Sequence, residues 1–332
     1  MSTRRRVIRS LLGGGLLACS HPWLARAASQ DAGPIDWPSK RIRIVVPYPP
    51  GGLTDSLGRL LADQLRALGP QGAYVENRPG AGTLLAGREV AKSPADGYTL
   101  MVATSTTLGI SQALFSNPLV QVNELSGIAM LGTVTLFLLA RPDFPATTVP
   151  ELISVLKAKP GTYTFASPGN GTPHHLLSEM LKSQAGVATI HVPYNGSSQA
   201  ITDVLGGRAD LLFIDATVAL PQMKAGTVRA LATTASGRSE LAPKVPALSE
   251  FYPNMDLQVW QAVVGPPGIP NSVVARLNDE INKMLSAPQF RARLIGMGLE
   301  PRNMSSEEFN TMIRKDAPRW VELVKRSGAK VD

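Results

Sequence analysis

Short apolar runs rich in Val and Ile alternate along the chain with longer segments in which leucines recur at helical spacing. The run RIRIVVPY at 41–48 favours a strand, and the segment at 56–68 places its leucines on one helical face. Runs at 98–104, 163–166 and 209–215 repeat the strand pattern, with helical segments between them. Alternating strands and helices indicate βαβ units. We therefore expect an α/β fold with mainly parallel sheets flanked by helices.

Two helix starts carry a capping signal. Thr148 precedes Glu151 by three residues, and Ser305 precedes Glu308 by the same spacing. In this arrangement the hydroxyl of the first residue and the carboxylate of the second each accept a backbone N–H group at the helix start. The second signal predicts a helix over 306–325.

Two polar, Gly-rich loops each lie between a predicted strand and a predicted helix. They read PYPPGGLTD at 47–55 and SPGNGTPHH at 167–175, and neither contains Lys or Arg. A helix N-terminus offers unpaired N–H groups and the positive end of the helix dipole. In open α/β sheets, ligands bind beyond the carboxyl ends of the strands. The loops therefore predict an anion site built from neutral donors, and an ion pair from Arg59 or Arg78 to the ligand would contradict it.

Nucleotide and acyl-transfer chemistry are not expected from these motifs. The pair Gly51-Gly52 is not followed by the Lys and Ser or Thr of a phosphate-binding loop, and 169–172 lacks the third glycine of a dinucleotide fingerprint. Ser154 and Lys157 match S-x-x-K without its partner motifs, which is typical of a helix surface. No cofactor is predicted.

Metal and acid–base roles are also not expected. A zinc site needs three or four ligands, and adjacent His174 and His175 would point about 100° apart on a helix. We interpret His175 as contacting a ligand carboxylate or bracing the loop, because no nucleophile accompanies it. Asp55 is interpreted as a helix-start residue that complements the dipole rather than as a general base. Asp215, at a strand end, is either a ligand contact or a solvated acid.

The positive charge is concentrated at the N-terminus. Five of the 33 Lys and Arg residues lie in 1–27, which has no acidic residue, and the remaining 28 face 25 acidic residues. Nucleic acid is therefore not an expected partner. A basic stretch, a short apolar run and the small residues at 25–27 predict an export signal over 1–27 and a periplasmic location. The twin-arginine and general secretory routes both fit, and Cys19, the only cysteine, leaves lipid anchoring as a further alternative.

Several motifs together resemble a known family. They are PYPPGGLTD, VENRPGAG, DGYTL, SPGNGTPHHL, VPYNGSSQAITDVLGGRADLLF, PPGIP and RLNDEINKML, in this order between Trp37 and Asp332. The combination resembles the Bug/TctC family of extracytoplasmic solute receptors for tripartite tricarboxylate transporters. The resemblance implies a two-lobed Venus-flytrap fold similar to type II periplasmic binding proteins. With the chain order, it predicts one lobe from 38–134 plus 260–332 and a second from 135–259.

The resemblance also implies the function and its residues. The protein would capture a small carboxylated ligand as a monomer and deliver it to membrane transporter subunits, with no catalytic residue and no metal. A sensor subunit for a membrane kinase is an alternative, and an exported hydrolase or lyase is a more remote one. Thr83, Ala86 and Ser198-Gln199 depart from the family pattern. The predicted ligand-binding residues are Tyr48, Pro49, Gly51, Gly52, Thr54, Asp55, Thr104, Ser105, Thr106, Ser167, Gly169, Asn170, Gly171, Thr172, His175, Tyr194 and Asp215.

Overall fold

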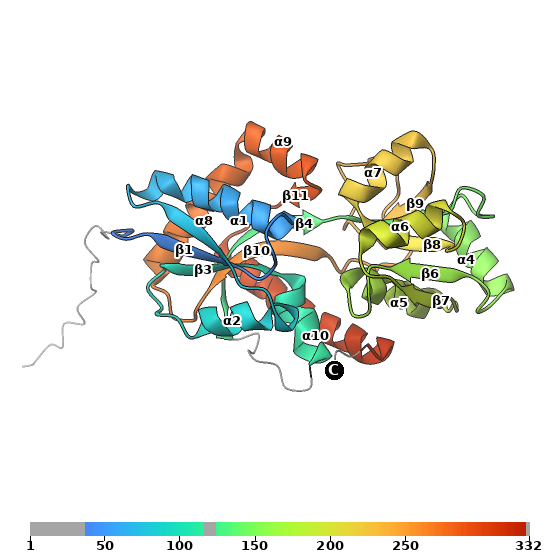
Figure 1. Cartoon of the computed structure of the whole chain (residues 1–332), viewed down its shortest axis with the longest axis horizontal. Helices are drawn as coiled ribbons and strands as arrows, with labels where there is room; N and C mark the ends of the chain where they lie inside the picture. The colour runs from blue at the N-terminus through green and yellow to red at the C-terminus, as the bar shows by residue number, and fades with distance from the viewer. Residues whose placement is uncertain (1–36, 116–123, 330–332) are drawn as a thin grey trace, which may run out of the picture. The chain divides into compact units, whose positions relative to one another are not determined.

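The alternating segments fold into two β-sheets, each accompanied by helices (Figure 1). The computed structural model describes residues 37–115 and 124–329. The predicted export signal at 1–27, with Cys19, lies outside the described residues. The α/β architecture expected from the sequence is confirmed.

The first sheet has six strands in the order β11-β4-β10-β3-β1-β2. Strand β1 pairs in parallel with β2 and β3, whereas β10 is antiparallel to β3 and β4, and β11 is antiparallel to β4. The strands are β1 Ile42–Val46, β2 Ala73–Asn77, β3 Thr99–Thr104, β4 Ser126–Val134, β10 Val259–Gly265 and β11 Leu299–Pro301.

The second sheet has five strands in the order β7-β6-β8-β5-β9. Strand β6 is parallel to β7 and β8, whereas β5 is antiparallel to β8 and β9. The strands are β5 Leu136–Ala140, β6 Thr164–Ser167, β7 Ile190–Pro193, β8 Leu211–Asp215 and β9 Arg229–Thr233.

Both sheets are mixed, which corrects the expectation of mainly parallel sheets. In the parallel pairs β1-α1-β2 and β6-α5-β7, a single α-helix connects two strands of the same sheet. Strand β4 instead passes into β5 through Thr135 alone, and these two strands belong to different sheets. A strand that enters a sheet without a crossover helix is free to run antiparallel to its neighbours.

Ten α-helices and four further helical turns accompany the strands in the described part of the chain. Thr148 and Ser305 each accept an N–H group at the start of a helix, as their spacing predicts. The helices are α1 Leu53–Gln64, α2 Leu84–Ala91, α3 Ser111–Leu114, α4 Val149–Ala158, α5 Pro173–Ala185, α6 Ser197–Leu205, α7 Ala216–Ala225, α8 Asn271–Ser286, α9 Pro288–Gly296 and α10 Ser306–Ser327. The turns are η1 Leu65–Leu68, η2 Ala81–Thr83, η3 Thr106–Ile110 and η5 Leu248–Glu250.

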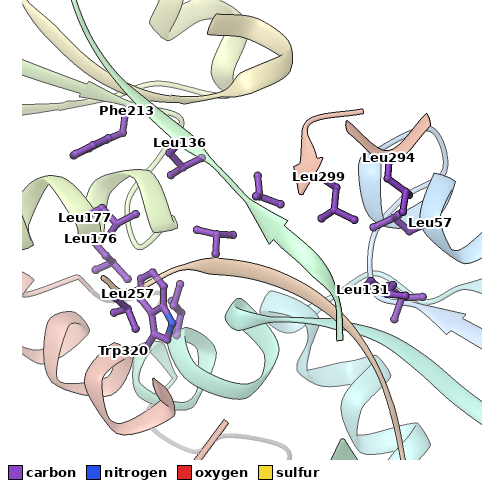
Figure 2. Close-up of a cluster of buried hydrophobic side chains, with 14 of the residues drawn as sticks. Leu57, Leu131, Leu136, Leu176, Leu177, Phe213, Leu257, Leu294, Leu299 and Trp320 are labelled. Atoms are coloured by element: carbon purple, nitrogen blue, oxygen red, sulfur yellow. The ribbon is translucent and has the colours of Figure 1, made fainter. Parts of the chain in front are cut away.

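One buried hydrophobic cluster contains residues from both sheets. It includes Leu131 of β4 and Leu136 of β5, and helix α10 adds Trp320 beside Leu176 of α5 (Figure 2). The described residues form one compact unit, so the lobes proposed from the sequence, with their boundaries, stay a prediction. Within the described ranges 37–115 and 124–329, no helix combines the length and apolarity needed to cross a membrane.

Candidate functional site

A cavity of about 870 Å³ lies where three helices begin. Helix α1 follows β1, α5 follows β6 and α7 follows β8, so the cavity lies beyond the carboxyl ends of strands from both sheets. It is lined by Tyr48–Thr54 and Ser56 around α1, Pro173 and His174 of α5, Asp215 and Thr217 at α7, Thr104 and Thr106 after β3, Val134 of β4, Val259 and Gln261 of β10, and Gly296–Gly298 at the end of α9.

A single carboxylate holds the loop between β1 and α1 in place. The Gly51 N–H group, in a residue with a φ of +97°, donates to the Oδ2 atom of Asp55 at 3.0 Å. Arg59 donates two N–H groups to the same carboxylate at 3.0 and 3.1 Å, and the Asn77 amide donates a fourth hydrogen bond at 2.9 Å. The Asn77 amide also donates to the Tyr48 carbonyl at 3.0 Å. Asp55 therefore stabilises the loop through hydrogen bonds and does not line the cavity.

The Asp55 carboxyl group is ionised at neutral pH. Burial would raise its pKa, but hydrogen bonds from Arg59, Gly51 and Asn77 and the charge of Arg59 hold that pKa below its usual value. A carboxylate that already accepts these bonds is a poor general base. This agrees with its interpretation as a helix-start residue.

The side of the cavity next to α1 presents neutral donors. The first turn of α1 has backbone N–H groups without intrahelical acceptors, at the positive end of the helix dipole. Thr54 donates its hydroxyl to the Oε1 atom of Gln261 at 3.2 Å, so the NH₂ group of Gln261 stays available. Burial raises the pKa of Tyr48, whose hydroxyl lies 3.5 Å from that of Thr104, so it stays protonated. These groups suit a carboxylate.

The second Gly-rich loop, 167–172, lies outside the cavity lining. Gly171 has a φ of +71°, and a Cβ atom there would lie 2.8 Å from a methyl carbon of Leu114 in α3. The Thr172 hydroxyl accepts the His175 N–H group at 3.4 Å and so caps α5. Glycine at this turn therefore permits close packing against α3.

His175 braces the second loop from inside. Its Nδ1 atom accepts the Gly171 N–H group at 3.1 Å, and its ring stacks on His191 with 3.9 Å between centroids and 8° between planes. The Nε2 atom of His191 lies 2.7 Å from the Ser167 hydroxyl oxygen. Burial lowers the pKa of His175 to about 4, and repulsion from His191 and Lys182 adds to this. The ring is neutral at pH 7, which is the form that can accept the Gly171 N–H group.

His174, the residue before His175 in α5, lines the cavity. Its Nε2 atom lies 3.3 Å from the Oδ2 atom of Asp215, the last residue of β8. Burial would raise the pKa of Asp215, but the charge and hydrogen bond of His174, with its own backbone N–H group, lower that pKa. Asp215 is therefore an ionised group on the cavity wall.

The structure brings only part of the predicted set together. Buried Ser105 and exposed Asn170 do not line the cavity, and the Tyr194 hydroxyl donates to Asp203 at 2.8 Å beside a separate cavity of about 450 Å³. The predicted residues that line the cavity are Tyr48, Pro49, Gly51, Gly52, Thr54, Thr104, Thr106 and Asp215. Those that do not are Asp55, Ser105, Ser167, Gly169, Asn170, Gly171, Thr172, His175 and Tyr194.

Several lining residues were missed by sequence reasoning. Gln261 carried a usable signal, because it is a polar residue inside the apolar run VWQAVVG and is buried. His174 was considered only as a metal ligand. Gly296, Met297 and Gly298 carry no local signal, because they reach the cavity only through the packing of α9 and β11.

The lining limits the chemistry of the site. None of the described lining residues is Lys or Arg. Arg59 pairs with Asp55, and Arg78 lies 2.6 Å from Glu76. Within the described ranges, no group of three or more His, Cys, Asp or Glu side chains is arranged to hold a metal ion.

Solved structures with this fold define the class of protein. A structure described as R. palustris Rpa4515 with adipate is 28% identical, with a TM-score of 0.73, and the match covers 89% of this chain and all of the other. A structure described as MatC from Rhodopseudomonas palustris with bound malate is 27% identical, with a TM-score of 0.69, covering 86% and 99%. A structure described as the periplasmic binding protein BugD is 29% identical, with a TM-score of 0.69, covering 89% and 99%. The α/β fold with two mixed sheets is that of periplasmic solute-binding proteins.

The family follows from the sequence. Residues 57–329 match the model of the tripartite tricarboxylate transporter family receptor, TctC. The chain is also 34% identical over 298 residues to the protein BugT of Bordetella pertussis, which covers 89% of this chain and 91% of BugT. The chain belongs to this receptor family, as the motifs predict. Family and fold are those of solute-binding receptors rather than enzymes.

Proposed function

We propose that this chain captures a small carboxylated organic anion in the periplasm and delivers it to the membrane subunits of a tripartite transporter. The observation that carries the proposal is the 870 Å³ cavity at three helix N-termini, whose described lining contains neutral donors and no Lys or Arg. Helix starts can satisfy a carboxylate without a buried cation, whose desolvation is costly. The adipate and malate in the two related structures support a carboxylate as the ligand class.

The ligand carboxylate lies at the start of α1 in this proposal. There it accepts N–H groups of the first turn, together with the amide of Gln261 and the hydroxyl of Tyr48. Asp55 keeps the Gly51 turn in place but does not touch the ligand. No catalytic step is assigned, because Asp55 and His175 are both engaged in bracing loops. No cofactor is required.

The protein works as a monomeric two-lobed clamp in this proposal, with lobes of 38–134 plus 260–332 and of 135–259. The cavity has lining residues from both lobes, so a bound ligand gains contacts that separated lobes lack. Ligand would then shift the population toward closure. Small-angle scattering should show a smaller radius of gyration at saturating ligand, and an unchanged profile would contradict the clamp.

A ligand screen tests the function. Thermal unfolding of the exported chain is measured with mono-, di- and tricarboxylates, amino acids and aromatic acids, and with uncharged amides of the same acids as controls. A ligand at about 100 times its Kd adds roughly 2.7 kcal/mol to the free energy of unfolding, so a true ligand should raise the melting temperature clearly. Stabilisation by the amides equal to that by the acids would refute the carboxylate site.

A further inference from the structure

An acidic side chain lies on the wall of a cavity suited to anions. Apart from Tyr48, the ionisable side chains of the described lining are Asp215 and His174. A carboxylate on the wall repels a ligand that carries only negative charge, and such repulsion is a common device for rejecting wrong ligands. The ligand class that accommodates Asp215 therefore differs from that of a site with donors alone.

His174 occupies only part of the Asp215 carboxylate. The contact between its Nε2 atom and the Oδ2 atom is the side-chain hydrogen bond that Asp215 makes within the described part of the chain. A carboxylate has about four lone-pair sites on its two oxygens, so acceptor capacity remains. The Asp215 side chain is 33% exposed, whereas that of His174 is 12% exposed. The free capacity of Asp215 therefore faces the cavity.

The groups that would contact the two ends of the ligand lie on different elements. The neutral donors belong to the start of α1 and to β10, whereas Asp215 is the last residue of β8, in the other sheet. The cavity between them has room for a ligand with two distinct ends. One end meets donors and the other meets an acceptor with negative charge.

We propose that Asp215 selects ligands that carry a protonated amine, or another cationic hydrogen-bond donor, in addition to a carboxylate. This rests on the proposed function, because the carboxylate end occupies the donors of α1. The amine donates to the free positions of the Asp215 carboxylate, and His174 holds that side chain toward the cavity. The ligand class is thus zwitterionic carboxylates rather than plain dicarboxylates.

Matched ligand pairs test the selection on the full exported chain. Isothermal titration compares succinate with aspartate, glutarate with glutamate, and butyrate with 4-aminobutyrate, where the pair members differ in the amine. In at least one pair the amine-bearing member should bind roughly 10- to 100-fold more tightly, as expected for a hydrogen bond between charged groups. Asp215→Asn keeps the shape and removes the charge, so it should abolish that preference, because the amine loses its charged acceptor and the amine-free member is no longer repelled. Asp63→Asn, at an exposed acid of α1, is the matched control and should retain the preference.

The outcomes separate this inference from the proposed function. If amine-free acids bind as tightly as their amine-bearing partners, the selection by Asp215 is wrong and the carboxylate receptor stands. The same holds if Asp215→Asn, shown to be folded by its thermal unfolding, keeps the preference. If no acid of either kind binds, both proposals fail together. The wild-type comparison alone decides the question if the variant does not fold.

Discussion

Replacing Gly51 with alanine tests whether the loop after β1 needs a backbone conformation that glycine alone adopts at low cost. Its φ is +97°, and no described atom beyond its chain neighbours lies within 4 Å of the position of a Cβ atom. A steric clash is thus excluded, and the cost is backbone strain. For a residue other than glycine at positive φ, the strain is about 1–2 kcal/mol.

The adjacent glycine is the matched control. Gly52 lines the same cavity, has similar open space and has a φ of −82° and a ψ of 177°, which alanine adopts readily. For Gly52→Ala, the loss of a preferred helix cap and the gain from a less flexible unfolded chain each amount to less than about 1 kcal/mol and oppose one another. Its stability should therefore change little.

Thermal unfolding measured by calorimetry compares the two variants with the wild type. A loss of 1–2 kcal/mol in a chain of this size lowers the melting temperature by roughly 2–8 °C, so Gly51→Ala should unfold clearly below Gly52→Ala. Equal melting temperatures for the two variants would refute the assignment of strain to Gly51.

Three further predictions concern the braces behind the site. In urea titrations, Gly171→Val should lower the free energy of unfolding by about 1–3 kcal/mol more than Gly161→Val. Both glycines have a positive φ, but only a side chain at position 171 would clash with a neighbour, Leu114. Equal losses of stability in the two variants would contradict this. Asp55→Ala should lower the free energy of unfolding by about 1–3 kcal/mol, since it removes a buried carboxylate that accepts four hydrogen bonds, and Arg59→Ala should lower it less, because Arg59 is exposed to solvent; the reverse order would count against the brace. The free energy of unfolding should fall as the pH drops from 6.5 toward about 4, because His175 becomes protonated at a higher pH in the unfolded chain than in the folded chain. A urea midpoint that is constant between pH 6.5 and 5 would disprove this contribution.

Strand and helix positions followed from local patterns where one face is buried or a cap is present. The predicted strand at 98–104 is β3, and the capping signal at Ser305 begins α10. Strand β4 was missed, because its sequence SGIAMLGTV is buried on nearly every residue and shows no alternation. A continuous apolar run does not distinguish a buried strand from a buried helix. The antiparallel pairs were missed for a related reason, since strand direction depends on how the chain enters a sheet.

For the candidate site, too, local sequence signals predicted one part and tertiary packing decided the rest. The loop after β1, which lines the described cavity, could be proposed from the sequence because its glycines, its polar helix start and the strand before it are close together in the chain. The second loop has the same local signals, but packing against Leu114 turns it away from the described cavity. Local signals identify a turn and a helix start, but not the surface that they face.

By itself, the sequence determined the alternation of strands and helices, the helix caps, the glycine turns and the family, because each depends on neighbouring residues or on motifs in a fixed order. Only the tertiary structure decided that Asp55 faces inward, that His175 stacks on His191, and that His174 meets Asp215 across 41 residues of chain. The physical reason is that side-chain environment, and with it charge state and accessibility, is created when distant elements pack. A pattern of residues predicts which groups are present, whereas packing selects those that a ligand can reach.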